Sequence, residues 1–174
     1  WVLQRRMIIF MFAAMKTNFL FVLALLVGMA ANSQMSRSLI GFVGNFTYNL
    51  DNEFQKGTIK LPKITNKRNG GTSGTLRLEV WLMDTKYYGA LEYKGYRIFS
   101  KSLGTLQGGW AYNDLKYDFE WASKPPKGSY YVSFILTEYN PTDGKDYTLS
   151  DYLSFDQKFE VTGKIDYDAF WDDL

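Results

Sequence analysis

Two carboxylates with a spacing suited to catalysis occur in the second half of the sequence, at Asp118 and Glu120. Alternate residues of a β-strand share one face and lie about 7 Å apart. A pair of carboxyl groups near that separation can hydrolyse a glycosidic bond without histidine or cysteine. One hypothesis is therefore a small carbohydrate-active hydrolase that uses Asp118 and Glu120. The simpler interpretation is two ordinary acids on the solvent face of a strand.

A second group of oxygen donors follows in the last third of the chain, at Asn140, Asp143, Asp146 and Asp151. Calcium takes six to eight oxygen ligands, and loops between strands can supply them. The spacing of these four residues lacks the alternate-position acids of an EF-hand loop, and the run 140–144 has the composition of a turn. We therefore predict no metal site and no cofactor.

Aromatic residues are the most unusual feature of the composition. The chain has 5 Trp, 13 Tyr and 13 Phe, and all but five of these 31 follow residue 33. Many are expected in a core, but six are not, because one lies on the polar face of its strand and five fall in loops. Exposed aromatic side chains provide a large contact area at low entropic cost. The alternative is that a second sheet or a long loop covers them. We predict that the six form a ligand-binding surface: Trp81, Tyr87, Tyr88, Tyr93, Trp110 and Tyr112.

Cysteine and histidine are both absent. Their absence excludes Ser-His-Asp and Cys-His nucleophile systems and zinc sites built from thiolates or imidazoles. Arg5, Arg6 and Lys16 are the only charged residues before residue 34, so 17 of the 20 basic residues and all 18 acidic residues follow it. A domain with a net charge of −1 lacks the basic surface of nucleic-acid-binding proteins, and we predict no nucleic-acid partner.

Alternation of apolar and polar residues identifies the strands that would position these side chains. The clearest runs are 75–82, 115–121 and 130–136, and weaker candidates are 42–48, 58–61, 96–101 and 155–161. A period of two is typical of a half-buried strand. The residues expected to face inward are Leu76, Leu78, Val80, Leu82, Leu115, Tyr117, Phe119, Trp121, Tyr130, Val132, Phe134 and Leu136.

Turn-forming residues separate these runs, at 69–74, 107–109, 124–128 and 140–144. Glycine supplies positive φ and proline fixes φ, which favours turns at these positions. We expect all four prolines, Pro62 included, at or outside strand ends, where a missing N–H costs no ladder bond. About seven short strands predict an all-β fold, an antiparallel immunoglobulin-like two-sheet sandwich over residues 34–163.

The N-terminal region has the pattern of an export signal. Lys16 precedes the uncharged run 19–31, and Ala31 and Ser33 are small residues that suit cleavage before Gln34. The run is shorter than the roughly 20 apolar residues that cross a membrane. We predict a cleaved signal-peptide helix over residues 15–33, with residues 1–14 as an upstream extension. Contact with a membrane would then require an uncleaved signal.

The segment 164–174 combines four Asp with three aromatic residues and departs from the strand pattern. Its simplest interpretation is a loosely docked terminal tail, and the alternative is a peptide that binds a partner.

The run 64–81 contains Asn69-Gly70-Gly71 followed by Ser73-Gly74-Thr75-Leu76-Arg77-Leu78. It resembles a segment of immunoglobulin-like modules in secreted bacterial proteins, in which one strand ends in an Asn-rich turn and the next begins at Ser-Gly-Thr-Leu-Arg-Leu. Pieces at 95–98, 103–109, 125–132 and 136–139 fit the same layout, so the likeness covers roughly residues 58–159. More distantly, the layout is similar to the cell-adhesion-related (CARDB) type of bacterial sandwich. Such modules are usually non-catalytic, and the resemblance implies no active-site residues.

These observations predict an exported, non-catalytic β-sandwich module, secreted, periplasmic or at the cell surface. Its role would be binding or structural, with a protein or glycan at the bacterial cell surface as partner. A carbohydrate-binding module is the first alternative, and the small hydrolase is the second.

Overall fold

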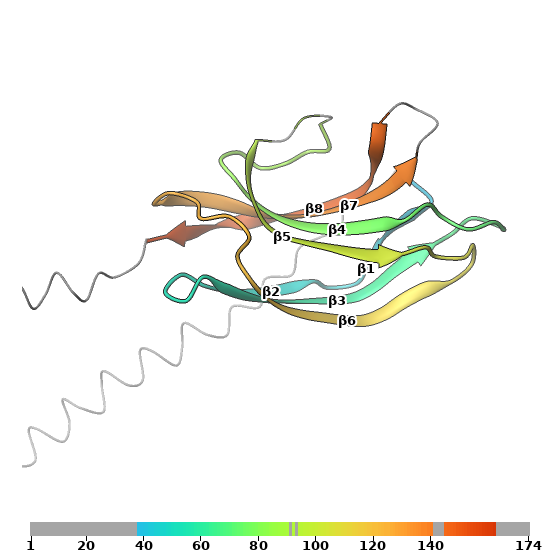
Figure 1. The fold of residues 1–174 in the computed structure, drawn as a ribbon, viewed down its shortest axis with the longest axis horizontal. Coiled ribbons are helices and arrows are strands. Elements are labelled where there is room, and N and C mark those ends of the chain that lie inside the picture. Colours follow the sequence, from blue (N-terminus) through green and yellow to red (C-terminus); the bar gives the residue numbers. More distant parts are fainter. Residues whose placement is uncertain (1–37, 91, 93, 141–144, 163–174) are drawn as a thin grey trace, which may run out of the picture.

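Two antiparallel β-sheets lie face to face in the computed structural model (Figure 1), which describes residues 38–90, 92, 94–140 and 145–162. The prediction of an all-β fold with two antiparallel sheets is confirmed. The described residues contain no helix, and so none of a length and hydropathy that would span a membrane. The signal peptide predicted over 15–33 and the tail over 164–174 lie outside the described residues.

The first sheet is organised around β3 (Lys56–Asn66). On one side β3 pairs with β6 (Ala111–Glu120) along nearly its whole length. On the other side it pairs with two short strands in succession, β1 (Ile40–Val43) and β2 (Thr47–Asp51). The single strand predicted over 42–48 is therefore wrong. Residues 44–46 interrupt it, because Gly44 has a φ of 101° and Phe46 turns fully into the core.

Pro62 lies inside β3, which contradicts its predicted place at a strand end. The interruption between β1 and β2 lies beside it, since Val43 pairs with Lys63 and Thr47 pairs with Lys60. Prolines in sheets are found where ladder pairing is interrupted or absent. A Cβ added to Gly44 would lie 3.0 Å from Cβ of Pro62, so the two residues need glycine at position 44 to approach this closely.

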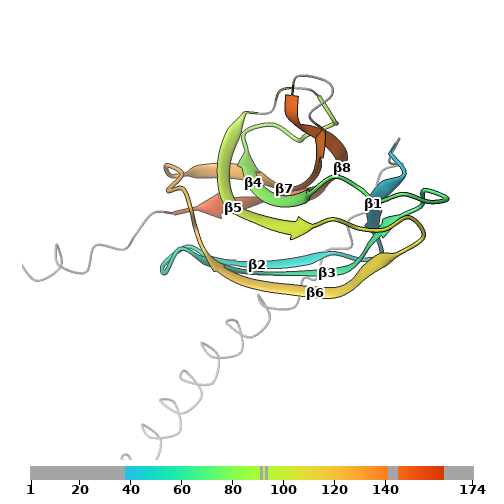
Figure 2. The same ribbon diagram turned by 45° about the vertical axis from the view of Figure 1, so that its right-hand side comes forward.

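The second sheet has the order β5-β4-β7-β8. Its strands are β5 (Gly95–Gly104), β4 (Leu76–Met83), β7 (Gly128–Asn140) and β8 (Lys145–Val161). Figure 2 shows this sheet curling away from the first, with β5 and β8 rising on either side of β4 and β7. Strand β8 begins ten residues before the predicted run 155–161. Register shifts against β7, such as the one between Leu136 and Thr137, interrupt the alternation there.

The core lies between the sheets, and the predicted inner faces are correct. Leu76, Leu78, Val80 and Leu82 of β4 are fully buried, as are Val132, Phe134 and Leu136 of β7. The ring of Phe134 lies edge-on to those of Phe46 and Phe155, with centroids 6.4 and 5.3 Å away. Burial of these rings between the sheets supplies a large apolar contribution to folding.

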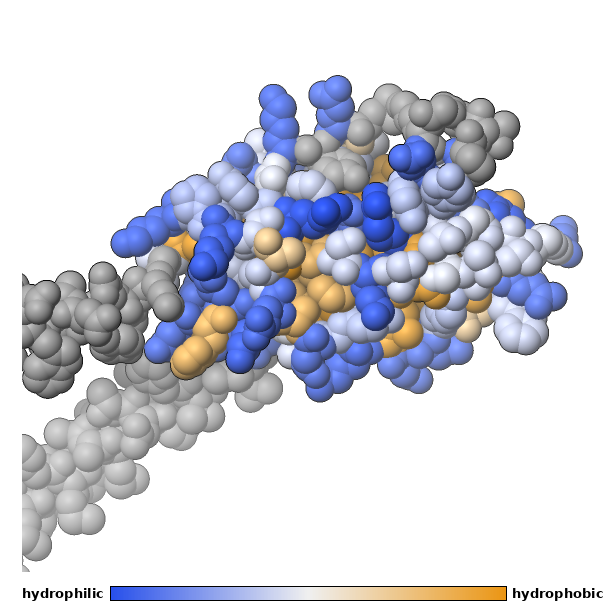
Figure 3. All heavy atoms as spheres, in the orientation of Figure 1, coloured by the Kyte–Doolittle hydropathy of each residue, from blue (hydrophilic) through white to orange (hydrophobic). Residues whose placement is uncertain are grey.

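The side of the sandwich where β5 faces β6 is closed by aromatic contacts. The ring centroid of Phe99 lies 4.6 Å from that of Phe119 and 5.8 Å from that of Tyr117. All three rings are only partly buried. Figure 3 shows apolar surface on this side of the molecule, flanked by hydrophilic residues.

Strand β7 is buried on both faces, which alternation did not predict. Ser133 and Ile135, expected to face solvent, are fully buried. Ile135 belongs to a second apolar cluster with Met83 and Tyr87 on the outer face of the second sheet. The segment 84–90 that follows β4 therefore packs back over part of that face.

Candidate functional site

The six aromatic residues predicted to form one surface divide into several environments. Tyr88 and Trp110 are exposed, at 67% and 62%. They lie at opposite ends of β4. Tyr88 is in the segment that follows Met83, the last residue of β4. Trp110 is in the turn that follows Gly104 of β5, and Gly104 pairs with Leu76, the first residue of β4. Tyr93 lies outside the described residues.

Tyr87 is 5% exposed, so the expectation that it lies on the surface is wrong. Its ring lies edge-on to Tyr152 of β8, with centroids 4.9 Å apart. Its hydroxyl donates to the carbonyl oxygen of Ala90, and its carbonyl oxygen accepts from Oγ of Ser154 at 3.1 Å. Composition suggests an open loop at this point, but these contacts hold the loop against the sheet.

Tyr112 lies in β6 opposite Ile64 and not in a loop, so that placement is also wrong. Its ring packs against the main core, and its hydroxyl lies 2.8 Å from the carbonyl oxygen of Leu103 and 2.9 Å from that of Thr105. Tyr112 therefore connects β6 to the end of β5.

Trp81 lies on the outer face of the second sheet, as its position in the alternation predicts. It is partly buried, because its ring packs against the second apolar cluster. Its Nε1–H donates to Oε2 of Glu79 at 2.9 Å. Trp81 is therefore held in one orientation on this face.

Glu79 is a residue whose place in the structure the sequence pattern did not reveal. Its position on the polar side of β4 predicts exposure, yet it is 1% exposed. Its Oε1 lies 3.0 Å from Nε of Arg77 and 3.0 Å from Nη1 of Arg97. A buried carboxylate requires charged or hydrogen-bonding partners, and Glu79 has two guanidinium groups and an indole N–H.

The two arginines reach the surface from this buried acid, with side chains 28% exposed at Arg77 and 46% at Arg97. Cζ of Arg77 lies 3.7 Å from the ring centroid of Tyr147 of β8. Tyr147 in turn lies edge-on to Tyr139 of β7, which is 40% exposed. We call these residues the arginine face: Arg77, Glu79, Trp81, Arg97, Tyr139 and Tyr147. Strands β4, β5, β7 and β8 all contribute to it.

The acid pair Asp118 and Glu120 lies on the outer face of the first sheet, and both residues are exposed, as predicted. They line an open groove of about 510 Å³ with polar side chains from β2 and β3. Across the three strands the pairing forms two rows, Asn49-Thr58-Asp118 and Asp51-Lys56-Glu120. The groove therefore combines an amide, a hydroxyl, an ammonium group and three carboxylates.

The pKa of Asp118 is lowered, first by the hydrogen bond from the Thr58 hydroxyl and then by Lys116. A general acid in glycoside hydrolysis needs a carboxyl whose pKa is raised. Asp118 is therefore poorly suited to that role.

Three of the four residues considered for calcium, Asn140, Asp146 and Asp151, lie among the described residues. Asp143 lies outside the described residues, and Asp151 is 4% exposed and turns toward the first sheet. Its Oδ2 accepts from the backbone N–H of Phe42 at 2.7 Å, and its Oδ1 accepts from that of Tyr152 at 2.9 Å. Among the described residues, no group of three or more acidic side chains is arranged to hold a metal ion.

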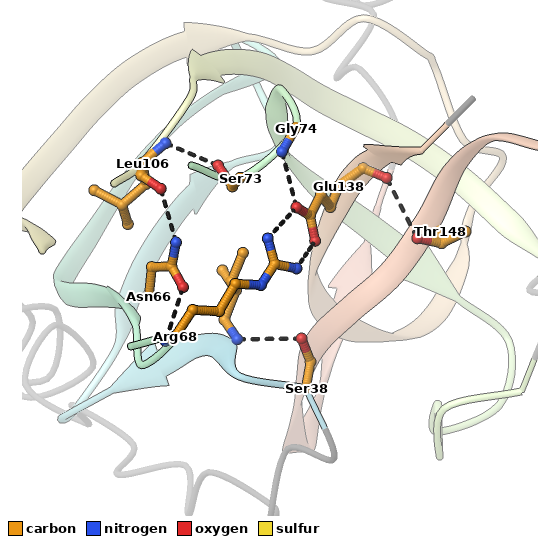
Figure 4. Close-up of polar contacts among 9 residues, drawn as sticks. Ser38, Asn66, Arg68, Ser73, Gly74, Leu106, Glu138 and Thr148 are labelled. Atoms are coloured by element: carbon orange, nitrogen blue, oxygen red, sulfur yellow. Dashed lines mark hydrogen bonds and ion pairs between the residues drawn. The ribbon is translucent and has the colours of Figure 1, made fainter. Parts of the chain in front are cut away.

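A polar network closes one end of the sandwich (Figure 4). Trp110 lies beside it, because its carbonyl oxygen accepts a hydrogen bond from the backbone N–H of Asn66. The guanidinium of Arg68 donates to both carboxylate oxygens of Glu138, at 2.8 and 2.7 Å. The backbone N–H of Gly74 donates to the same carboxylate, and Nδ2 of Asn66 donates to the carbonyl oxygen of Leu106. The run that resembles immunoglobulin-like modules thus contributes structural hydrogen bonds at this end.

Comparisons of the chain with family models, with curated proteins and with solved structures gave no match.

Proposed function

We propose that this protein is an exported, non-catalytic binding module, located at the bacterial envelope or outside the cell, that recognises a protein partner through the arginine face. The observation that carries the proposal is the buried Glu79 carboxylate. It orients the side chains of Arg77, Arg97 and Trp81 on the outer surface of one sheet.

The residue types of this face favour a protein partner. Trp, Tyr and Arg are the side chains that most often dominate the energetics of protein interfaces. Orienting them before binding reduces the conformational entropy that is lost in the complex. Two arginines against one glutamate leave a net charge of +1, so the complementary partner surface would be acidic.

We also propose that the two sheets form an immunoglobulin-like sandwich, which fits a module of an exported protein. The connectivity supports this assignment: β3 lies in the first sheet, β4 and β5 in the second, β6 returns beside β3, and β7 and β8 complete the second. Crossing between sheets in this way is typical of Greek-key sandwiches.

A peptide-display selection against the immobilised protein tests the proposed function while the partner is still unidentified. We expect the selected peptides to be rich in Asp and Glu, and their affinity to fall at least tenfold with Arg77→Ala or Arg97→Ala. Lys116→Ala on the opposite sheet, with a side chain 56% exposed, is the matched control. Peptides that lose affinity with Lys116→Ala and not with the two arginine variants would refute the assignment to this face, as would a selection that yields none.

Carbohydrate binding is the second candidate, favoured by the polar groove beside Asp118. Its mixture of amide, hydroxyl, ammonium and carboxylate groups can donate to and accept from sugar hydroxyls. A glycan array with the wild-type protein and the variants Asn49→Ala and Glu120→Gln is the test. Retention of a sugar by wild-type protein that both variants abolish would support the groove as its site, and absence of any retained sugar would remove this candidate.

A further inference from the structure

The arginine face has hydrogen-bond donors that the described part of the protein does not use. Nε of Arg77 lies 3.0 Å from Oε1 of Glu79 without forming a hydrogen bond, whereas Nη1 of Arg97 donates to the same oxygen. Within the described residues, the two Nη groups of Arg77 and the Nη2 and Nε of Arg97 have no hydrogen-bond partner. Guanidinium groups whose N–H donors remain available are suited to bind carboxylates in a bidentate manner.

We propose that the segment 164–174 of the same chain occupies the arginine face. This segment carries Asp166, Asp168, Asp172 and Asp173 against one basic residue, Lys164, so its net charge is −3. It also carries three aromatic residues, Tyr167, Phe170 and Trp171. Its carboxylates complement the two guanidinium groups, and its rings complement the exposed ring of Tyr139.

The segment is long enough to reach this face. Strand β8 ends at Val161, which pairs with Gly128, and the pairing partner of Trp81 on β7 is Ser133. Five residues along β7 and two strand spacings across the sheet amount to roughly 20 Å. Seven extended residues from Val161 to Asp168 span up to about 25 Å. Asp168 can therefore reach Arg97, which pairs with Trp81. Arg77 lies four residues further along β4, and Asp172, four residues further along the segment, can reach it.

Both signs of charge lie between the end of β8 and the arginine face, since the exposed acids Asp156 and Glu160 flank Lys158 on β8. Lys158 pairs with Tyr131 on the outer face, between the end of β8 and the level of Trp81. Its ammonium group lies 5.0 Å from the ring centroid of Tyr131, so it stands over the sheet surface. An acidic segment that leaves β8 would pass this cation before it reaches Arg97.

One consequence rests on the proposed function: the segment would compete with an acidic partner for the same donors. A segment that occupies the face in two thirds of the molecules weakens a competing ligand about threefold. Docking of the segment itself does not depend on the existence of such a partner.

NMR of the full chain labelled with ¹⁵N tests the docking directly. We compare the wild type with a variant in which all four acids of the segment are changed to Asn, which removes the charge and keeps the length. We expect the Trp81 indole N–H and the Arg97 Nε–H resonances to shift in the variant. The indole signal of Trp110, which lies in the turn between β5 and β6 and outside the arginine face, should not move. Sodium chloride at about 0.5 M should cause the same shifts, because salt screens exposed charges.

Unchanged Trp81 and Arg97 resonances in the Asp-to-Asn variant would overturn the docking. Shifts that depend on protein concentration would also overturn the proposal that the segment docks on its own chain, because they would show that it binds a second copy of the protein. An unsuccessful peptide selection with these shifts present would remove the proposed function and leave the docking intact, so the two failures are distinguishable.

Discussion

The carboxylate of Asp151 on β8 accepts a hydrogen bond from the backbone N–H of Phe42 on β1, 109 residues earlier, at a distance of 2.7 Å. This bond joins the edge of one sheet to the edge of the other, where the strands themselves form no ladder. The second oxygen of Asp151 accepts from the N–H of Tyr152. The side chain thus satisfies two backbone donors at the junction of the sheets.

Asp151→Ala should lower the free energy of unfolding by about 3 kcal/mol, because it leaves two backbone donors without this acceptor in a buried site. Urea denaturation measures the change. Asp156→Asn, on the same strand with a side chain 81% exposed and paired with Lys86, should cost less than about 1 kcal/mol. Equal effects of the two substitutions would contradict the role assigned to Asp151.

The ion pairs of Glu79 should respond asymmetrically to substitution. The double variant Arg77→Ala, Arg97→Ala leaves a buried carboxylate that keeps the hydrogen bond from the Trp81 indole but has lost both cations, and should cost about 3–5 kcal/mol. Glu79→Leu leaves two arginines that can extend into solvent, and should cost at least about 2 kcal/mol less than the double variant. Chemical denaturation of the three proteins checks this order, and the reverse order would show that Glu79 tolerates loss of its cations.

Tyr87 and Tyr88 are adjacent and should differ sharply. Tyr87→Ala removes a 5%-exposed ring from the cluster with Met83 and Ile135, and should destabilise the protein by about 3 kcal/mol. Tyr88→Ala removes a ring that is 67% exposed and should change stability by less than about 0.5 kcal/mol. Thermal unfolding of the two variants is the measurement. Similar melting temperatures would mean that the loop does not pack on the sheet.

Gly74 should not tolerate a side chain. A Cβ at this position would lie 2.0 Å from the carbonyl oxygen of Tyr139, so Gly74→Ala must displace backbone and should cost about 3 kcal/mol. Gly70 is the control in the same loop, because a Cβ there meets nothing within 4 Å. Circular dichroism during urea titration should show Gly70→Ala unfolding at the wild-type midpoint or slightly above it.

The Thr58 hydroxyl should control the titration of Asp118. Its hydrogen bond is the largest cause that lowers the pKa of Asp118, and Lys116 is the next. Because its pKa is lower in the folded state, the Asp118 carboxylate stabilises the folded protein. That contribution is complete above the pKa that Asp118 has in the unfolded chain, and it is lost as the pH falls through the folded-state pKa. Thr58→Val should therefore raise the pKa of Asp118, whereas Thr58→Ser should leave it low. Carboxyl ¹³C NMR titration measures both, and an unchanged pKa in Thr58→Val would assign the shift to Lys116.

Alternation in the sequence was sufficient to predict the all-β class and the inner faces of the central strands. Leu76, Val80, Val132 and Phe134 are buried as predicted. The reason is local: successive side chains of a strand point to opposite faces, so a period of two assigns each residue to a side whatever strand lies next to it.

Tertiary structure alone decided which residues on the outer faces are covered. Glu79 has the same position in the alternation as a solvent-facing acid, and its burial depends on Arg97, 18 residues away. Tyr87 is buried because its loop folds onto Tyr152 of the last strand. Asp151 turns inward because Phe42 offers an N–H where the two sheets meet. In the last two cases the partners are far apart in the sequence and meet only after the strands have assembled, and no local pattern in the sequence records such partners.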